Sequence, residues 1–315
     1  MQRWENNKSG VEVILASPRG FCAGVVRAIE TVKLTIESSD SPVYVLHEIV
    51  HNKHVISELE GLGARFVKDL DEIPGGEICI FSAHGVSVAT EKQAQRHNLR
   101  TIDATCPLVT SIHRMVEQYH SNGYDVIIIG HHGHPEVEGT AGRVFHRVHV
   151  VANESEAAHV KVRDPEKVAY VTQTTLSQQD VIGIKSVLEK RFSNIKGPLK
   201  SNICYATQNR QNAVRYLATK TDLIFVVGSK NSSNSNRLKE VADEAGGTSY
   251  LIDDYRDIEP SWLKDVKIIG LTAGASAPER LVNGVLEWLN DNVDVKSISE
   301  MEGTEETISF KPATI

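Results

Sequence analysis

Four cysteines are spread through this chain of 315 residues, and three of them share one local setting. Cys22, Cys106 and Cys204 each come just before an amphipathic stretch that predicts a helix. A helix N-terminus carries about half a positive charge and unpaired N–H groups, and both favour thiolate over thiol. Thiolates are the ligands of iron–sulfur clusters. We interpret these three cysteines as ligands of one cluster that leaves a fourth position vacant.

The fourth cysteine, Cys79, lies in the apolar run Ile78–Phe81 and is typical of a small buried core residue. A single cysteine before a helix is more often structural, and the chain has no Cys-X-X-Cys pair of the kind that marks many metal sites. A structural role for the other three cysteines therefore stays open as an alternative. Their wide, irregular spacing argues against a disulfide scaffold.

Histidines and hydroxyl-rich loops follow other predicted strands, where they can bind an anion. His51, His84 and His134 can donate to phosphate oxygens, more strongly if protonated. The loops Gly228–Asn236 and Thr272–Glu279 can present side chains and backbone N–H groups to the same ligand. We expect these segments to form one anion pocket.

Two features of these segments leave alternatives. Ser276 with Glu279 also fits a helix capping box, as Ser177 with Asp180 does, and capping is the commoner role for an isolated serine of this kind. The cluster of His131, His132 and His134 before Glu136 could instead hold the metal of a hydrolase.

Glu136 is the best candidate for a proton donor. A carboxyl in a dry pocket beside an anionic ligand should have a raised pKa and keep its proton for delivery. Glu138 is the alternative, and Thr174 could relay the proton or hold a substrate hydroxyl.

These residues must be positioned by alternating strands and helices. Short runs rich in Val and Ile predict buried parallel strands, each followed by a helical pattern, which indicates an α/β fold with mostly parallel sheets. The strands expected on this basis are Val11–Ala16, Val43–Leu46, Ile78–Phe81, Asp125–Ile129, Val168–Thr172, Leu223–Val227 and Ile268–Leu271. Because the three cysteines are separated by 84 and 98 residues, we expect three pseudo-repeated lobes arranged so that the cysteines meet at a common centre. The expected boundaries are 11–106, 107–203, 204–290 and a tail at 291–315, with the first strand able to pair with the third lobe.

Composition excludes some classes of partner. A formal charge of −7 argues against a nucleic-acid binder, and no segment approaches the roughly 20 apolar residues needed to span a bilayer. The polar N-terminus lacks the apolar core of a signal peptide, so we expect a cytoplasmic protein. A non-enzymatic redox sensor with an open cluster remains a rival to an enzyme.

Taken together, the motifs resemble one family, 4-hydroxy-3-methylbut-2-enyl diphosphate reductase, which ends the methylerythritol phosphate route to isoprenoids. The match runs in order from about Val11 to about Asn290. The segments that carry it are Pro18–Gly24, Ser82–Val86, Asp103–Thr110, Gly133–Thr140, Thr172–Ser177, Gly228–Arg237 and Thr272–Ser276.

The resemblance implies a trefoil of three α/β lobes around a central [4Fe–4S] cluster. Cys22, Cys106 and Cys204 would hold the cluster, with one iron not ligated by protein and open to the substrate hydroxyl. The residues implied to bind the diphosphate are His51, His84, His134, Ser232, Ser233, Asn234 and Ser276.

The resemblance also implies the reaction and its residues. Glu136 would govern proton delivery together with His134 and Thr174, and Thr175 would line the substrate site. The family's reaction uses two electrons and two protons, releases water, and yields isopentenyl and dimethylallyl diphosphates. A ferredoxin or flavodoxin is the implied electron donor. The sequence differs from the family pattern at His132, where a small residue is usual, and the tail is the least similar part.

Overall fold

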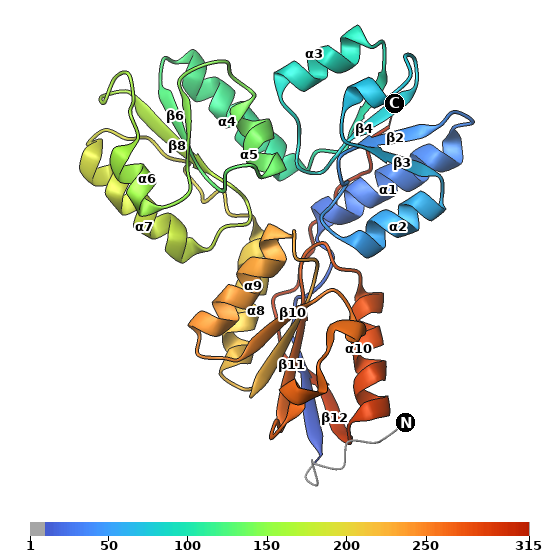
Figure 1. Cartoon of the computed structure of the whole chain (residues 1–315). Helices are drawn as coiled ribbons and strands as arrows, with labels where there is room; N and C mark the ends of the chain where they lie inside the picture. Colours follow the sequence, from blue (N-terminus) through green and yellow to red (C-terminus); the bar gives the residue numbers. More distant parts are fainter. Residues whose placement is uncertain (1–9, 315) are drawn as a thin grey trace. The chain divides into compact units, whose positions relative to one another are not determined.

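A computed structural model describes residues 10–314, in which strands and helices alternate along the chain (Figure 1). The expectation about the N-terminal signal falls largely on residues outside this range. Contacts divide the chain into two compact units: unit 1 comprises residues 1–22, 51–55 and 205–308, and unit 2 comprises residues 23–50, 56–204 and 309–315. The predicted α/β class with parallel sheets is confirmed.

Unit 1 is built on a five-stranded parallel sheet of order β10-β9-β11-β1-β12. The first strand of the chain lies inside this sheet, between the two strands that come last in sequence. The strands are β1 (Val11–Leu15), β9 (Leu223–Val227), β10 (Ser249–Ile252), β11 (Ile268–Ala273) and β12 (Val295–Glu300).

Helices cover both faces of this sheet. Helix α10 (Glu279–Asn292) packs Leu281, Val285 and Leu289 against one face. On the other face, α8 (Tyr205–Ala218) and α9 (Ser233–Glu244) bury an apolar cluster with the sheet. Every residue of β9 is buried, as its unbroken apolar sequence predicts for a central parallel strand.

Unit 2 contains two smaller parallel sheets. The first has the order β3-β2-β4-β5, with β2 (Val43–Leu46), β3 (Ala64–Val67), β4 (Ile78–Phe81) and β5 (Arg100–Asp103). Its helices are α1 (Ala23–Ser38), α2 (Lys53–Gly61), whose first three residues belong to unit 1, and α3 (Val88–Arg96). Cys79, a residue of β4, is completely buried in an apolar core, as the sequence predicted.

The second sheet of unit 2 has the order β7-β6-β8, with β6 (Asp125–Ile129), β7 (Val148–Val151) and β8 (Val168–Thr172). Apolar side chains of α4 (Pro107–Ser121) and α5 (Pro135–Ala141) pack on one face. Those of α6 (Glu154–His159) and α7 (Gln178–Arg191) pack on the other. Both faces of each strand are therefore covered, and the carboxyl ends of the strands are left to carry polar loops.

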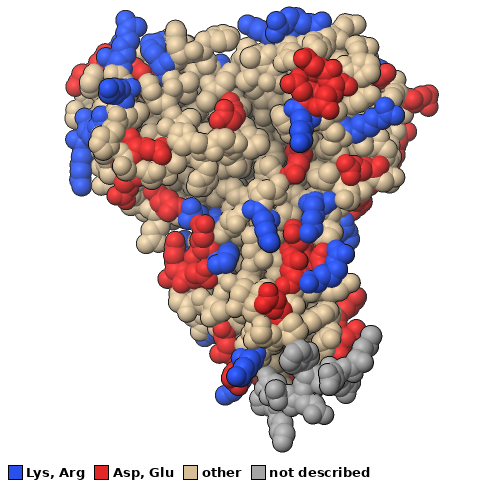
Figure 2. Space-filling model, viewed as in Figure 1, with Lys and Arg blue, Asp and Glu red and all other residues tan. Residues whose placement is uncertain are grey.

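The surface carries charges of both signs. In Figure 2, acidic and basic side chains are interspersed over the face in view. Within residues 10–314, none of the helices is both long and apolar enough to cross a membrane.

Candidate active site

The loop that carries Cys22 is held by backbone hydrogen bonds within unit 1. Cys22 is the last residue before α1, as predicted, and its thiol is partly exposed. Its N–H donates to the carbonyl of Ala275 at 3.2 Å, and the N–H of Gly20 donates to the carbonyl of Ala273 at 3.1 Å. Gly20 has φ of +68°, a backbone conformation that favours glycine. The Cys22 loop is therefore fixed against the loop that follows β11.

The same β11 loop contacts the segment of His51 at the start of α2. Asn52 caps this helix, since its Oδ1 accepts from the N–H groups of His54 and Val55. Ser276 Oγ donates to the carbonyl of His51 at 3.0 Å. Ser276 does not cap α10, whose N-cap position is Pro278, so the capping alternative was wrong for Ser276.

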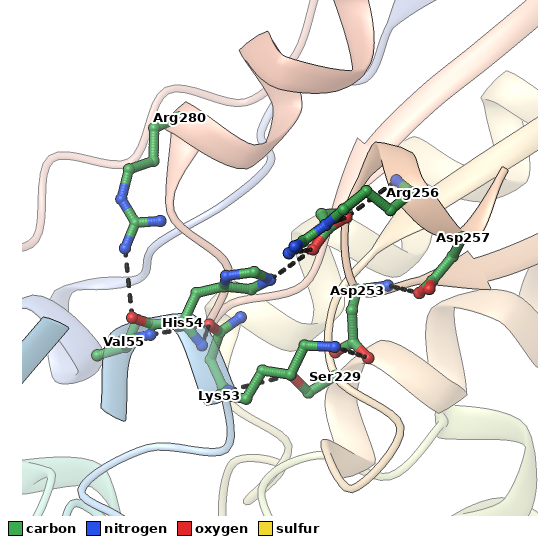
Figure 3. A network of polar contacts seen from close by, with 10 residues as sticks. Lys53, His54, Val55, Ser229, Asp253, Arg256, Asp257 and Arg280 are labelled. Carbon is green, nitrogen blue, oxygen red and sulfur yellow. Dashed lines mark hydrogen bonds and ion pairs between the residues drawn. The ribbon is translucent and has the colours of Figure 1, made fainter. Parts of the chain in front are cut away.

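A network of polar and charged groups holds the segment after His51 in place within unit 1 (Figure 3). Lys53 Nζ lies 2.7 Å from Asp253 Oδ2, and Nε2 of His54 lies 2.9 Å from Asp254 Oδ2. The Arg256 guanidinium, which donates to Asp254 at 2.6 Å, holds the pKa of that carboxyl well below its usual range. The position of His51 thus depends on contacts made by its neighbours in sequence.

The predicted Ser/Asn loop begins α9 and faces the β11 loop. Ser232 caps the helix by accepting from the N–H of Ser235, and its Oγ lies 3.5 Å from that of Ser276. Asn234 Oδ1 accepts from the N–H of Ala275 at 2.8 Å. The amide nitrogen of Asn234 is buried and has no hydrogen-bond partner among the described residues. A buried donor without a partner is costly, so this nitrogen is suited to an anionic ligand.

A buried carboxylate–threonine pair is the central feature of unit 2. Thr174 donates twice to Glu136, from its N–H to Oε1 at 2.6 Å and from its Oγ1 to Oε2 at 2.7 Å. Glu136 is 4% exposed and Thr174 is 6% exposed. The carbonyl of Thr174 accepts from the N–H of Cys204 at 3.1 Å, so this pair lies directly beside a predicted cluster ligand.

His134 precedes Glu136 and caps α5. Its Nδ1 accepts from the N–H of Glu136 at 3.1 Å, which requires the proton of the neutral ring to be on Nε2. Its ring lies 5.8 Å from that of His84 in an edge-to-face arrangement. Two predicted anion-binding histidines are therefore neighbours in unit 2.

Thr175, predicted to line the substrate site, is held by a residue that the sequence reasoning missed. Gln173 is 2% exposed, its Nε2 donates to Thr175 Oγ1 at 2.9 Å, and its Oε1 accepts from the N–H of His131. The signal was its place inside the polar run that follows β8. His132 pairs with Glu156 at 2.8 Å and its side chain is 60% exposed, so the extra imidazole is directed to the surface.

The cysteines have the environments expected of ligands. The four cysteines all lie within the described residues and form no disulfide. Cys106 occupies the N-cap position of α4 and Cys204 directly precedes α8, so all three predicted ligands stand at helix starts. Burial raises the pKa of Cys79 to about 12, which keeps it a thiol. The donor set of three partly exposed thiols at helix N-termini fits an iron–sulfur cluster.

The meeting of these three sulfurs in space stays a prediction. Cys106 and Cys204 belong to unit 2 and Cys22 belongs to unit 1. Among residues 10–314, no three histidine, cysteine, aspartate or glutamate side chains form a group that could hold a metal ion.

Known proteins resemble the chain over nearly its whole length. It is 60% identical to 4-hydroxy-3-methylbut-2-enyl diphosphate reductase of Desulfotalea psychrophila, covering 97% of each chain. It is 52% identical to the protein of the same name from Aromatoleum aromaticum, covering 95% of this chain and 96% of that one.

Solved structures agree with these relatives. The chain superposes on the E-1-hydroxy-2-methyl-but-2-enyl-4-diphosphate reductase of Plasmodium falciparum with a TM-score of 0.91 at 38% identity, covering 95% of this chain and 94% of that one. The family profile described as LytB protein matches residues 13–290. The chain belongs to the LytB protein family.

Proposed function

We propose that the chain is a reductase that converts (E)-4-hydroxy-3-methylbut-2-enyl diphosphate to isopentenyl and dimethylallyl diphosphates. The allylic C–O bond breaks, the oxygen leaves as water after taking a proton, and two electrons with a second proton form the new C–H bond. Near full-length identity to reductases of that name supports this assignment. The observation that carries it is the buried Glu136–Thr174 pair beside Cys204.

Membership of the family implies an iron–sulfur cofactor. In our proposal this is a [4Fe–4S] cluster held by Cys22, Cys106 and Cys204, with one iron not ligated by protein. When bound, such a cluster supplies electrons and a Lewis-acidic site. The cysteines can supply thiolates because each stands at a helix N-terminus.

The diphosphate is proposed to bind to donors from both units. His51, Ser232, Ser233, Asn234 and Ser276 would contribute from unit 1, and His84 and His134 from unit 2. Two observations support this assignment: the buried amide nitrogen of Asn234 lacks a partner among the described residues, and His134 Nε2 can donate. Holding the substrate by its anionic end would orient the distant hydroxyl for cleavage.

Proton delivery is assigned to Glu136 acting through Thr174. For this relay Glu136 would be protonated on Oε2. As the hydroxyl proton of Thr174 passes to the departing oxygen, the Glu136 proton would move to Thr174 Oγ1 along the same 2.7 Å contact, with the hydrogen bond reversed from the direction described above. His134 fixes the start of the helix that carries Glu136, and Thr175 would line the same space.

The wider organisation is proposed as follows. Lobes 11–106, 107–203 and 204–290 would surround the cluster as a trefoil, followed by a C-terminal tail at 291–315. A small iron–sulfur or flavin electron carrier such as ferredoxin or flavodoxin would supply the electrons, and the cytoplasm is the proposed compartment.

Anaerobic purification followed by metal analysis and a turnover assay tests the proposal. We expect iron together with acid-labile sulfide, and formation of both isoprenoid diphosphates when the hydroxylated diphosphate and a chemical reductant are supplied. Zinc without sulfide would support the rival hydrolase. A cluster-loaded protein that gives no reduction of the substrate would support the redox sensor.

A further inference from the structure

Arg210 is a fully buried cation whose hydrogen bonds converge on the backbone of the Cys22 loop. It lies on α8 and is 1% exposed. Its Nε and Nη2 both donate to the carbonyl of Gly20, at 3.0 and 2.8 Å, and Nη2 also donates to that of Phe21 at 3.3 Å. These two carbonyls belong to the residues immediately before Cys22.

The charge of Arg210 is balanced by Glu306, from the tail beyond β12. Arg210 Nη1 donates to Glu306 Oε1 at 3.0 Å and to the carbonyl of Ala206 at 2.9 Å. Asn209 adds a hydrogen bond to the same carboxylate at 3.0 Å. Every N–H of the guanidinium therefore has an acceptor, as a buried charge requires.

Three further contacts in unit 1 lie near the Cys22 loop, the first from Glu300 at the end of β12 and the other two from the tail. Arg19 donates to Glu300 at 3.0 Å, and the N–H of Met301 donates to the carbonyl of Leu15 at 3.0 Å. Gly303 lies so close to Ser17 that an added Cβ would collide with the backbone of that residue. The tail is thus packed along the loop, and Glu306 completes the contact.

We propose that Arg210 and Glu306 are positioning residues for Cys22. Residues at the end of β11 and in the loop after it accept hydrogen bonds from the N–H groups of Gly20 and Cys22. Arg210, paired with Glu306, binds the carbonyl groups of Gly20 and Phe21, so the Cys22 loop is held on both sides of its backbone. The Cys22 thiolate is then presented in one geometry rather than sampling several. This inference rests on the proposed function, because it takes Cys22 to be a cluster ligand.

The test compares Glu306→Gln with the matched control Glu305→Gln. Both changes remove one negative charge from adjacent tail residues, but Glu305 is exposed and Glu306 is partly buried against Arg210. The readouts are the rate at which an iron chelator strips the anaerobic holoenzyme, followed by the cluster's visible absorption, and the electron paramagnetic resonance spectrum of the reduced cluster. Breaking a buried ion pair leaves an uncompensated charge, so we expect about tenfold faster cluster loss in Glu306→Gln and a wild-type rate in Glu305→Gln.

Arg210→Lys separates geometry from charge. It keeps the cation but loses the planar fork that binds Gly20 and Phe21, so faster cluster loss and an altered spectrum are expected here too. If Glu306→Gln does not fold, the same measurements on Asn209→Ala, which loses a single hydrogen bond to Glu306, decide the question.

The possible outcomes separate this inference from the assignment on which it depends. Cys22→Ser that retains full iron and sulfide would overturn the ligand assignment itself. A different result would refute only the positioning role: Cys22→Ser loses the cluster, but Glu306→Gln and Arg210→Lys keep the wild-type chelation rate and spectrum. Asn209→Ala takes the place of Glu306→Gln in this comparison if the latter does not fold. The proposed function would then stand.

Discussion

Two acidic residues, Glu136 and Glu138, stand two positions apart at the start of α5, and the helix directs them differently. Glu136 points inward, where both of its oxygens accept hydrogen bonds from Thr174. Glu138 is exposed, and its Oε1 accepts only a long bond from the N–H of Gly133 at 3.3 Å among the contacts described. Burial therefore distinguishes two carboxyls that sequence alone left as alternatives.

Replacing Glu136 with Gln should lower kcat by about 10²- to 10⁴-fold, because a positioned proton donor contributes that much to typical enzymes. Iron and sulfide content and substrate affinity should remain close to wild type. Glu138→Gln is the control and should keep its turnover. Anaerobic single-turnover kinetics with a chemical reductant measure the difference, and near-normal turnover of Glu136→Gln would remove this residue from its role.

His113 on α4 makes the folding stability of the protein depend on pH. Burial, reinforced by the charge of Arg143, lowers the pKa of His113 from 6.5 to about 4. Between these values the unfolded chain binds a proton that the folded protein does not, so stability is fully present above about pH 6.5 and falls as the pH approaches 4.

We expect the free energy of unfolding to fall by about 2 kcal/mol between about pH 7 and about pH 5 because of His113. His113→Gln should show a correspondingly smaller acid destabilisation than wild type, while exposed His159→Gln should behave as wild type. Chemical denaturation of the apo protein at the two pH values measures this. Equal acid slopes for wild type and His113→Gln would contradict the prediction.

At the scale of elements, glycines allow α5 to approach the loop of His84. A Cβ on Gly139 of α5 would lie 2.8 Å from the carbonyl oxygen of Gly85, which has φ of +78°. A Cβ on Gly85 would in turn meet the ring of His113 at 2.6 Å. The helix that carries Glu136 and the loop that carries His84 are therefore in backbone contact.

Gly139→Ala should destabilise the protein by about 1–3 kcal/mol, because the added methyl overpacks a backbone contact. Substrate affinity should fall as well, since the spacing of His84 and His134 would change. Gly61→Ala on α2 is a suitable control, because that position is exposed and has no neighbour within 4 Å. Thermal unfolding and substrate titration of both variants give the comparison, and equal Tm values would argue against the close contact.

The strands β1, β2, β4, β6, β8, β9 and β11 could be predicted because they are short, mostly apolar runs. The other described strands, β3, β5, β7, β10 and β12, have shorter or interrupted apolar runs and were not predicted. β2, β4, β6, β8 and β9 begin and end where the sequence predicted, and β11 extends two residues further. Residue type and position in the sequence likewise predicted that the three cysteines lie at helix starts and that Glu136 is buried. Side-chain partners across long sequence separations could not be predicted.

Three residues illustrate that limit. Ser276 has the spacing of a helix cap, yet its hydroxyl donates to His51, which is 225 positions away. Arg210 has no distinctive local pattern, and the place of Gln173 in the polar run after β8 does not identify its partners. Their roles follow from partners that only the folded chain supplies. Local sequence specifies local structure, whereas these contacts depend on the packing of whole elements.

At the scale of the whole molecule, a cofactor bound by residues from distant parts of the chain should contribute to stability. A ligand that binds only the folded state stabilises it. Stripping iron and sulfide should therefore lower Tm, and Cys106→Ser should largely abolish the difference between loaded and stripped protein. Cys79→Ala, which changes a buried core residue, should keep both the cluster and the Tm difference. Anaerobic calorimetry provides the measurement, and identical Tm values for loaded and stripped wild type would contradict the prediction.

The place of β1 has a consequence for how the chain is made. Residues 11–15 leave the ribosome long before their neighbours in the sheet, β11 (Ile268–Ala273) and β12 (Val295–Glu300), are synthesised. During most of translation, this apolar strand therefore has neither of its pairing edges filled. Until residue 300 has emerged, these unpaired strand edges are open to contacts with other chains, so the sheet of unit 1 can be completed only late in synthesis.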